Sequence, residues 1–133
     1  MFSHIHVGIT DFERALEFYS PLMKRLGHVL KFSDGEKSWA GWKPSDAERP
    51  LFLIGIPYDG NPAVPGNGQM IALLAPSRAV VDGCYQVAIA QGAQPEGEPG
   101  LRPQYHPNYY GAYFRDPDGN KLCVCCHEPE ASR

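Results

Sequence analysis

The fold of this chain is decided by residues 115–121, which read Arg-Asp-Pro-Asp-Gly-Asn-Lys. Asp116 at the first turn position, Pro117 at the second and Gly119 at the fourth favour a type I turn. Gly119 can adopt the left-handed conformation, so we expect a three-residue hairpin loop that closes with a bulge. The stretch therefore predicts two antiparallel strands joined at this point, with Asp116 paired with Asn120.

The register of this hairpin follows from the turn by counting outward. Tyr113 is predicted to face Cys123, and Gly111 to face Cys125. Paired residues project to the same face of a sheet, so the side chains of Tyr113 and Cys123 should be neighbours. A slip of one residue would place Ala112 there instead and would turn every side chain to the other face.

The first half of the chain predicts a strand, a helix and three further strands. Thr10 and Glu13 suit a capping box, in which each side chain satisfies a free backbone N–H at the helix start. Apolar residues at spacings of three and four then continue to Gly27, which ends the helix. Alternation on the opening strand places His4 and His6 on the same face. The strands are expected at residues 2–9, 28–33, 37–42 and 51–56.

The second half repeats this order after a loop. Residues 57–68, with three Pro and three Gly, predict a connection without regular structure. Ser77 is a good N-cap for a second helix, which Gly92 closes. When the second half is laid on the first, Met70 falls on His4. The strands are expected at residues 69–75, 93–97, 109–115 and 121–127.

The fold class follows from this repeat. Each half alone would leave one face of its sheet exposed, so the halves must pack together or pair with another chain. We expect one α+β domain over residues 1–133, built from two βαβββ units at about 1–58 and 68–128. The alternative is a single irregular α+β sheet without internal symmetry.

Composition and charge exclude several classes of protein. The 133 residues carry a net charge of −3, and scattered Lys and Arg residues argue against a surface for nucleic acid or anionic membranes. No apolar run approaches the roughly 20 residues that a membrane span needs. The opening residues lack the basic and apolar regions of a signal peptide. We therefore expect a cytoplasmic protein whose cysteines are reduced.

Three segments resemble the vicinal oxygen chelate superfamily, which includes glyoxalases, bleomycin-resistance proteins and extradiol dioxygenases. They are the opening strand at residues 4–7 with the helix after it, the strand at 68–72 and the hairpin at 113–122. The resemblance implies that the paired units form an incomplete barrel around a concave ligand cavity, often beside a divalent metal. It also implies a small-molecule ligand and a homodimer.

The metal ligands of that superfamily carry over only in part. His4 matches the first ligand, on the opening strand. Met70 and Cys123 stand where the family carries His and an acidic residue, and no ligand is evident near Leu53, the fourth position. A thioether and a thiol are poor ligands for Mg²⁺ or Mn²⁺. The usual metal set is therefore incomplete, and the resemblance leaves open only a divalent Zn, Ni, Mn or Fe ion at His4.

The candidate site residues combine these positions with other side chains of the same face. Tyr113 matches an active-site tyrosine of extradiol dioxygenases, and Cys123 would be a nucleophile if His4 lay beside it. Arg102 would clamp a carboxylate or phosphate, unless its aromatic segment, residues 100–110, packs only on itself. The predicted catalytic residues are His4, Tyr113 and Cys123, and the predicted substrate-binding residues are His6, Met70, Arg102 and Tyr109.

Residues 123–127 contain C-x-x-C-H, the attachment motif of c-type haem. This segment alternates as a strand, which turns Cys123 and Cys126 to opposite faces. We therefore expect neither haem attachment nor a thioredoxin-like thiol pair. Cys84 and Cys126 are expected to be buried thiols that act as small apolar side chains.

Two functions are implied, from different classes. The first is a glyoxalase-like enzyme that performs proton-transfer or lyase chemistry on a polar organic substrate by general acid–base action. The alternative is a metal-free protein that sequesters a drug or metabolite in a mostly apolar pocket, as bleomycin-resistance relatives do. A non-catalytic scaffold is a third interpretation. The sequence does not identify the ligand.

Overall fold

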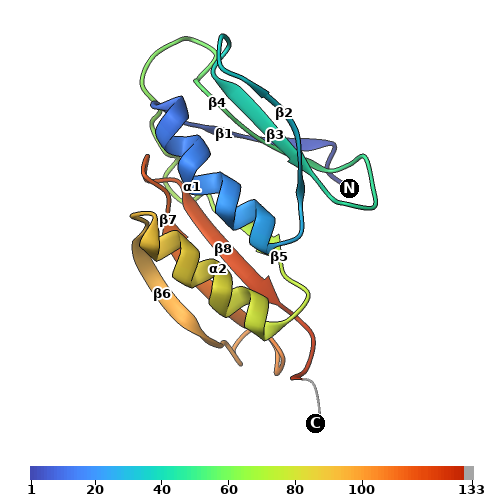
Figure 1. Ribbon diagram of the computed structural model, residues 1–133. Helices are drawn as coiled ribbons and strands as arrows, with labels where there is room; N and C mark the ends of the chain where they lie inside the picture. Colours follow the sequence, from blue (N-terminus) through green and yellow to red (C-terminus); the bar gives the residue numbers. More distant parts are fainter. Residues whose placement is uncertain (131–133) are drawn as a thin grey trace.

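Two helices lie side by side over one face of two sheets in the computed structural model, which describes residues 1–130 (Figure 1). The first half contains β1 (His4–Gly8), α1 (Phe12–Arg25), β2 (Val29–Asp34), β3 (Trp39–Lys43) and β4 (Leu51–Gly55). The second half contains β5 (Ile71–Leu74), α2 (Arg78–Ala90), β6 (Gln94–Leu101), β7 (Tyr110–Arg115) and β8 (Lys121–Cys126). The predicted α+β class and its two βαβββ units are confirmed.

Both halves build the same type of sheet. The strand orders are β1-β4-β3-β2 and β5-β8-β7-β6. In each sheet the first strand of the half pairs in parallel with the last strand, and the remaining pairs are antiparallel. Both sheets are open, so together they form the expected incomplete barrel. β1 and β5 are edge strands, so within residues 1–130 each has one side along which no other strand is paired.

The N-cap of helix α1 lies one residue later than predicted. Asp11, not Thr10, is the N-cap, and its side chain accepts a helix N–H at 3.1 Å. Thr10 connects other segments instead: its hydroxyl accepts the N–H of Ala63, and its own N–H donates to Asp118. The helix ends before Gly27, which has the left-handed φ of 84° that favours glycine.

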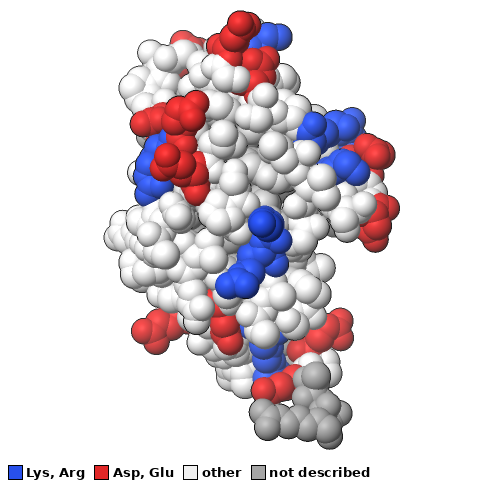
Figure 2. All heavy atoms as spheres, viewed as in Figure 1, with Lys and Arg blue, Asp and Glu red and all other residues white. Residues whose placement is uncertain are grey.

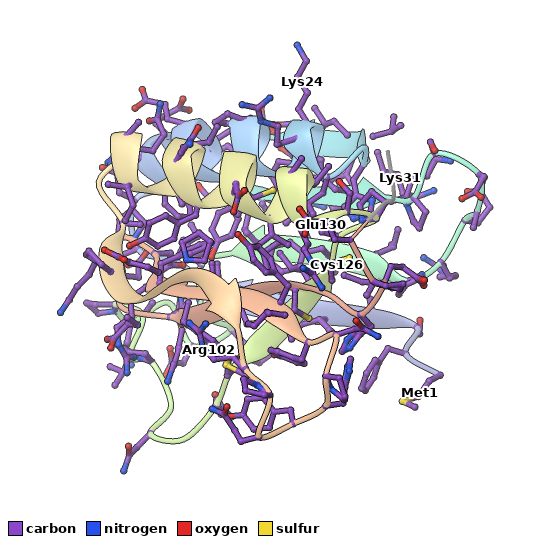
Figure 3. The ribbon with its side chains drawn as sticks, turned by 90° about the horizontal axis from the view of Figure 1, so that it is seen from below. Met1, Lys24, Lys31, Arg102, Cys126 and Glu130 are labelled. Carbon is purple, nitrogen blue, oxygen red and sulfur yellow. The ribbon has the colours of Figure 1, made fainter. Side chains whose placement is uncertain are left out.

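The core lies between the helices and the sheets, and the two helices fill it differently. α1 supplies the fully buried Phe18 and Tyr19, and the Phe18 ring lies 6.3 Å from that of Phe114 on β7 of the other half. α2 supplies smaller side chains, such as the buried Cys84. Burial raises the pKa of Cys84 to about 11, so this thiol stays protonated at neutral pH. Cys126 lies between helices and sheet (Figure 3), and the apolar role predicted for both thiols is confirmed.

The hairpin between β7 and β8 has the predicted register. The N–H of Asp116 donates to the carbonyl of Asn120 at 2.9 Å, and Gly119 has a φ of 91°. Tyr113 pairs with Cys123, as counting outward from the turn predicted. The hairpin therefore places the side chains of this pair on one face of the second sheet.

Two contacts tie this hairpin to the first half of the chain. The hydroxyl of Tyr19 on α1 donates to the carboxylate of Asp116 at 2.5 Å, and Asp116 is only 4% exposed. Burial raises the pKa of both groups. The side-chain amide of Asn120 donates to the carbonyl of Gly8 at the end of β1, at 2.8 Å. These contacts fix the start of β8 beside the end of β1.

Neither helix within residues 1–130 has the length and apolar composition that crossing a bilayer requires. Figure 2 shows the charged side chains of the helix-bearing face in separate groups of both signs. On this face, the Lys and Arg residues that the structure describes are as scattered as they are in the sequence.

Candidate functional site

A large hollow lies along the edge strands β1 and β5, on the sheet face that points away from the core. We call it the inter-sheet cleft, and its volume is about 1420 Å³. Its walls include His6 on β1, Trp39 on β3, Met70 just before β5 and Lys121 on β8. Residues 57–68, the connection between the halves, contribute much of the remaining wall. Both halves and their connection therefore build one concave surface.

A second hollow, of about 830 Å³, adjoins the cleft. We call it the aromatic hollow, because Tyr105, Tyr109 and Tyr113 line it together with Arg115. Several residues, including Met70 and Lys121, line both hollows. A ligand that enters the cleft can therefore extend over the tyrosines.

Cys123 lies beneath the tyrosines at the centre of a hydrogen-bonded cluster. The hydroxyl of Tyr109 lies 3.0 Å from that of Tyr113 and 3.5 Å from the sulfur of Cys123. Hydrogen bonds from Cys125, Tyr109 and Tyr113 stabilise the thiolate, as does the charge of Arg102, and they lower the pKa of Cys123 to about 7 against the opposing effect of burial. Cys123 is fully buried, so the thiolate is available only when its cover moves.

Tyr109 belongs to a loop that packs on its own aromatic rings. A nitrogen of His106 lies 2.8 Å from one of His127, and the two imidazoles stack. The ring of Tyr109 contacts His127 edge-on, with centroids 5.3 Å apart, and Tyr105 packs against Tyr109 in the same manner. The imidazole pair therefore holds the loop, and with it Tyr109, over Cys123.

Arg102 lies on the side of the sheets away from the helices (Figure 3). Its guanidinium donates to the carbonyls of Glu98 at 2.8 Å and Leu101 at 3.4 Å, and it lies 5.4 Å from the centre of the Tyr113 ring. Arg102 does not line the two hollows directly. It adds positive charge beneath their tyrosine wall.

The two histidines of β1 have different positions. His6 lines the cleft, and partial burial together with the charge of His4 lowers the pKa of its imidazole, which is therefore neutral at pH 7. His4 is exposed, lies 2.9 Å from the hydroxyl of Ser3 and lines neither hollow. The register places Cys123 opposite Ala72 rather than Met70. The structure thus gathers Met70, Tyr109, Tyr113 and Cys123, but not His4.

The donor set does not fit the divalent metal used by many vicinal oxygen chelate proteins. Within residues 1–130, no three His, Cys, Asp or Glu side chains come close enough together to hold a metal. Of the family positions, His4 is exposed outside the cleft, Met70 offers a thioether, and Cys123 is covered by Tyr109.

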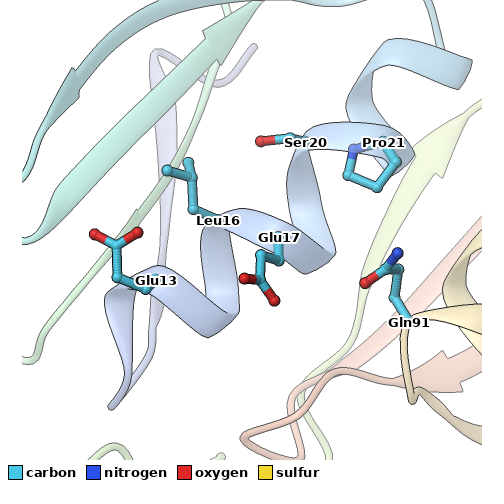
Figure 4. Close-up of a pocket in the computed structure, with 6 residues that line it drawn as sticks. All are labelled: Glu13, Leu16, Glu17, Ser20, Pro21 and Gln91. Carbon is cyan, nitrogen blue, oxygen red and sulfur yellow. The ribbon is translucent and has the colours of Figure 1, made fainter.

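A third hollow lies on the helix side of the molecule (Figure 4). Its lining comes from α1 and from Gln91, just beyond α2: Glu13, Leu16, Glu17, Ser20, Pro21 and Gln91. Its volume of about 490 Å³ is smaller than those of the two concave hollows. The concave surface is the stronger candidate because its hollows are larger and strands of both sheets contribute to its walls.

Two open sheets built from paired βαβββ units define the fold class of this chain. The family model "Glyoxalase/Bleomycin resistance protein/Dioxygenase superfamily" matches residues 1–124. The chain therefore belongs to this superfamily, as the sequence resemblance predicted. No curated protein matches the chain.

Solved structures agree with this assignment. A glyoxalase/bleomycin resistance protein from Albidiferax ferrireducens T118 is 35% identical, with a TM-score of 0.85 over 95% of this chain and 98% of that one. A glyoxalase-related enzyme from Fulvimarina pelagi is 20% identical, with a TM-score of 0.70 over 95% and 87%. A family enzyme from Burkholderia phytofirmans PsJN is 17% identical, with a TM-score of 0.69 over 95% and 98%. The last two likenesses show the fold alone.

Sequence reasoning missed Lys121 and the wall formed by residues 57–68. Lys121 stands two residues before Cys123, so strand alternation already places the two side chains on the same face. No comparable signal marks the connection, because loop residues have no periodicity that assigns them to a face. Of the two tryptophans, Trp39 lines the cleft and Trp42 is buried in the core.

Proposed function

We propose that this protein binds a small organic molecule on its concave surface without the divalent metal that many members of the superfamily use. The observation that carries this proposal is the continuity of the two hollows, which share Met70 and Lys121. Ligand sites are typically concave and mostly apolar, with a few polar groups that fix orientation. Trp39, Met70 and the tyrosines offer the apolar area, while His6 and Lys121 offer polar anchors.

A second candidate function is a glyoxalase-like enzyme for proton transfer on a polar organic substrate. The lowered pKa of His6 favours it, because a neutral imidazole in a ligand cleft can act as a general base. His6→Gln would then abolish turnover of a bound substrate while leaving its affinity nearly unchanged. Pure sequestration predicts no turnover in either form.

The homodimer and the cytoplasmic location stay predictions from the sequence and its resemblance. Sedimentation equilibrium of the purified chain measures the first. Fractionation of cells that express the native gene measures the second.

The binding proposal can be tested through the methionine methyl groups, which occupy three distinct environments. Met70 lines both hollows, Met23 is fully buried on α1, and Met1 is exposed. The protein is labelled with ¹³C at the methionine methyls and titrated with 2-naphthoate and with the neutral 2-naphthalenemethanol. We expect the Met70 resonance to shift with at least one probe while Met23 stays fixed.

The same titration is repeated with the chelator EDTA, and the shift of Met70 should not change. If neither probe moves Met70 at millimolar concentration, the proposed function is wrong. If EDTA removes the shift and Zn²⁺ or Mn²⁺ restores it, binding depends on a metal and the metal-free part of the proposal is wrong.

A further inference from the structure

The concave surface contains a positive charge without an acidic partner. Lys121 lines both hollows, and its ammonium group lies 5.9 Å from the centre of the Tyr113 ring. It takes part in none of the salt bridges found within residues 1–130. A cation at the junction of two hollows, unmatched by the protein itself, is placed to meet charge on a ligand.

The other charged groups nearby are already satisfied. Arg115 is paired with Glu96, at 2.5 Å, and also donates to a backbone carbonyl. Of the described residues, Asp59 is the one acidic residue that lines the cleft, and it accepts hydrogen bonds from the N–H and the side chain of Asn61. Among residues 1–130, no acidic residue lines the aromatic hollow. The hollow therefore has a positive surplus, although the whole chain carries a net charge of −3.

Arg102 adds to the positive charge near the hollow, although it does not line the hollow itself. Its guanidinium carbon lies 5.4 Å from the centre of the Tyr113 ring, and backbone carbonyls occupy part of its N–H groups. The Tyr113 ring is thus in contact range of two cations, Arg102 and Lys121. Of the two, Lys121 lines the hollow and can reach a ligand there.

The tyrosines determine the shape of the ligand that this charge would serve. The rings of Tyr105 and Tyr109 lie 4.9 Å apart, edge to face, and Tyr113 continues the wall beside Lys121. Aromatic walls pack best against flat apolar groups. The hydroxyls of Tyr109 and Tyr113 are hydrogen-bonded to one another and give this wall a polar rim.

We infer that the aromatic hollow recognises a small organic acid, whose carboxylate binds Lys121 and whose flat apolar body packs against Tyr105, Tyr109 and Tyr113. A single unpaired lysine suits one negative charge, whereas a dianionic phosphate favours several donors or a bidentate arginine. This inference rests on the proposed function and assigns the chemical class of the ligand.

The test compares two probes that share a naphthalene ring. 2-Naphthoate carries a carboxylate, and 2-naphthalenemethanol carries a neutral alcohol at the same position. Their dissociation constants are measured by titrating the Met70 methyl resonance in three proteins: the natural chain, Lys121→Gln and Lys24→Gln. Lys24→Gln removes the same charge from α1, where Lys24 points away from the sheets (Figure 3).

We expect the natural chain to bind 2-naphthoate about tenfold more tightly than the alcohol, as a charge-assisted hydrogen bond typically gives. Lys121→Gln should remove this preference by weakening the acid alone, and Lys24→Gln should keep it. Raising the salt concentration should weaken 2-naphthoate binding and leave the alcohol unchanged.

Three outcomes would overturn the inference, and they differ from failure of the proposed function. Equal affinity for both probes in the natural chain shows that charge is not recognised. An equal loss for both probes in Lys121→Gln shows that Lys121 acts through shape, and an equal effect of Lys24→Gln shows that only net charge matters. In each case the shift of Met70 still supports binding. If neither probe shifts Met70, the proposed function fails and the inference fails with it.

Discussion

The two halves of the molecule have the same backbone fold, but the side chains that they bury differ in size. Both helices begin at an N-cap that accepts a helix N–H, Asp11 in α1 and Ser77 in α2. The same offset matches Phe18 with Cys84, two fully buried residues of very different size. α1 therefore contributes fully buried rings to the common core, whereas the fully buried side chains of α2 are small and its Tyr85 and Ile89 are only partly buried.

The concave faces of the two sheets also carry different side chains at matching positions. In the first half, His6 on β1 pairs with Leu53 on β4, so an imidazole lies beside an aliphatic side chain. In the second half, Ala72 on β5 pairs with Cys123 on β8, and a thiol with its phenol cover takes the place of the leucine. The two copies of a duplicated unit can therefore keep one backbone fold while their core and concave side chains change independently.

The largest expected effect is a difference in stability between truncations at matching positions of the two helices. Phe18→Ala should lower the free energy of unfolding by about 3–5 kcal/mol, because it removes a buried ring that contacts Phe114 of the other half. Cys84→Ala, at the matching position, should cost only about 1 kcal/mol. Urea denaturation measures both. If Phe18→Ala does not fold while Cys84→Ala does, the cost at position 18 is already the larger of the two. Equal costs at the two positions would remove the asymmetry of the helices.

The next effect concerns the concave faces and the cover over Cys123. Tyr109→Ala should raise the rate at which iodoacetamide alkylates Cys123 by at least about tenfold, since a fully buried thiol becomes accessible. Tyr109→Phe retains the ring and should stay close to the natural rate. Mass spectrometry of the modified peptide measures each rate, and Cys84, with its pKa of about 11, is the unreactive reference.

The pH dependence of that alkylation sharpens the same prediction. The remaining donors Cys125 and Tyr113 hold the pKa of Cys123 below its ordinary 9.0, so the rate in Tyr109→Ala should already rise in the neutral range. A rate that begins to rise only near pH 9 would contradict the thiolate-stabilising cluster.

The smallest effect tests the acid sensitivity of the first half. His6 and His28 both have pKa values below 6.5, and burial is the main cause for each. The unfolded chain then binds protons more tightly, so this contribution to stability is complete above pH 6.5 and is lost as the pH falls below it. The drop in Tm from pH 7.5 to pH 5.5 should be smaller in His6→Gln/His28→Gln than in the natural chain. An unchanged drop would show that His6 and His28 are not the source of the acid sensitivity.

Much of the fold could be predicted from the sequence, because its signals are local. The turn at Asp116 to Asn120 is determined by a few residues, and it fixed the pairing of Tyr113 with Cys123. The helix start was wrong by one residue, because Thr10 and Asp11 are both good caps and only tertiary contacts decide between them. Thr10 was already engaged with the connection between the halves.

The site was harder to predict, because its members meet through tertiary packing. The sequence grouped His4 with Cys123 by family position, but His4 lies outside both hollows. The cover by Tyr109 depends on a loop whose path is set by the contact between His106 and His127. Such a contact between residues far apart in sequence leaves no periodic signal.

The connection at residues 57–68 affects the symmetry of the cleft that a ligand would occupy. Duplication produced two of every helix and strand, but a joint between copies can exist only once. Because this joint forms part of the cleft wall, the pseudo-twofold axis of the scaffold does not extend to its cavity. A ligand in the cleft therefore meets walls that differ between the two halves of the molecule. Evolution can reshape the cleft by changing the length of a single loop, without disturbing either ancestral unit.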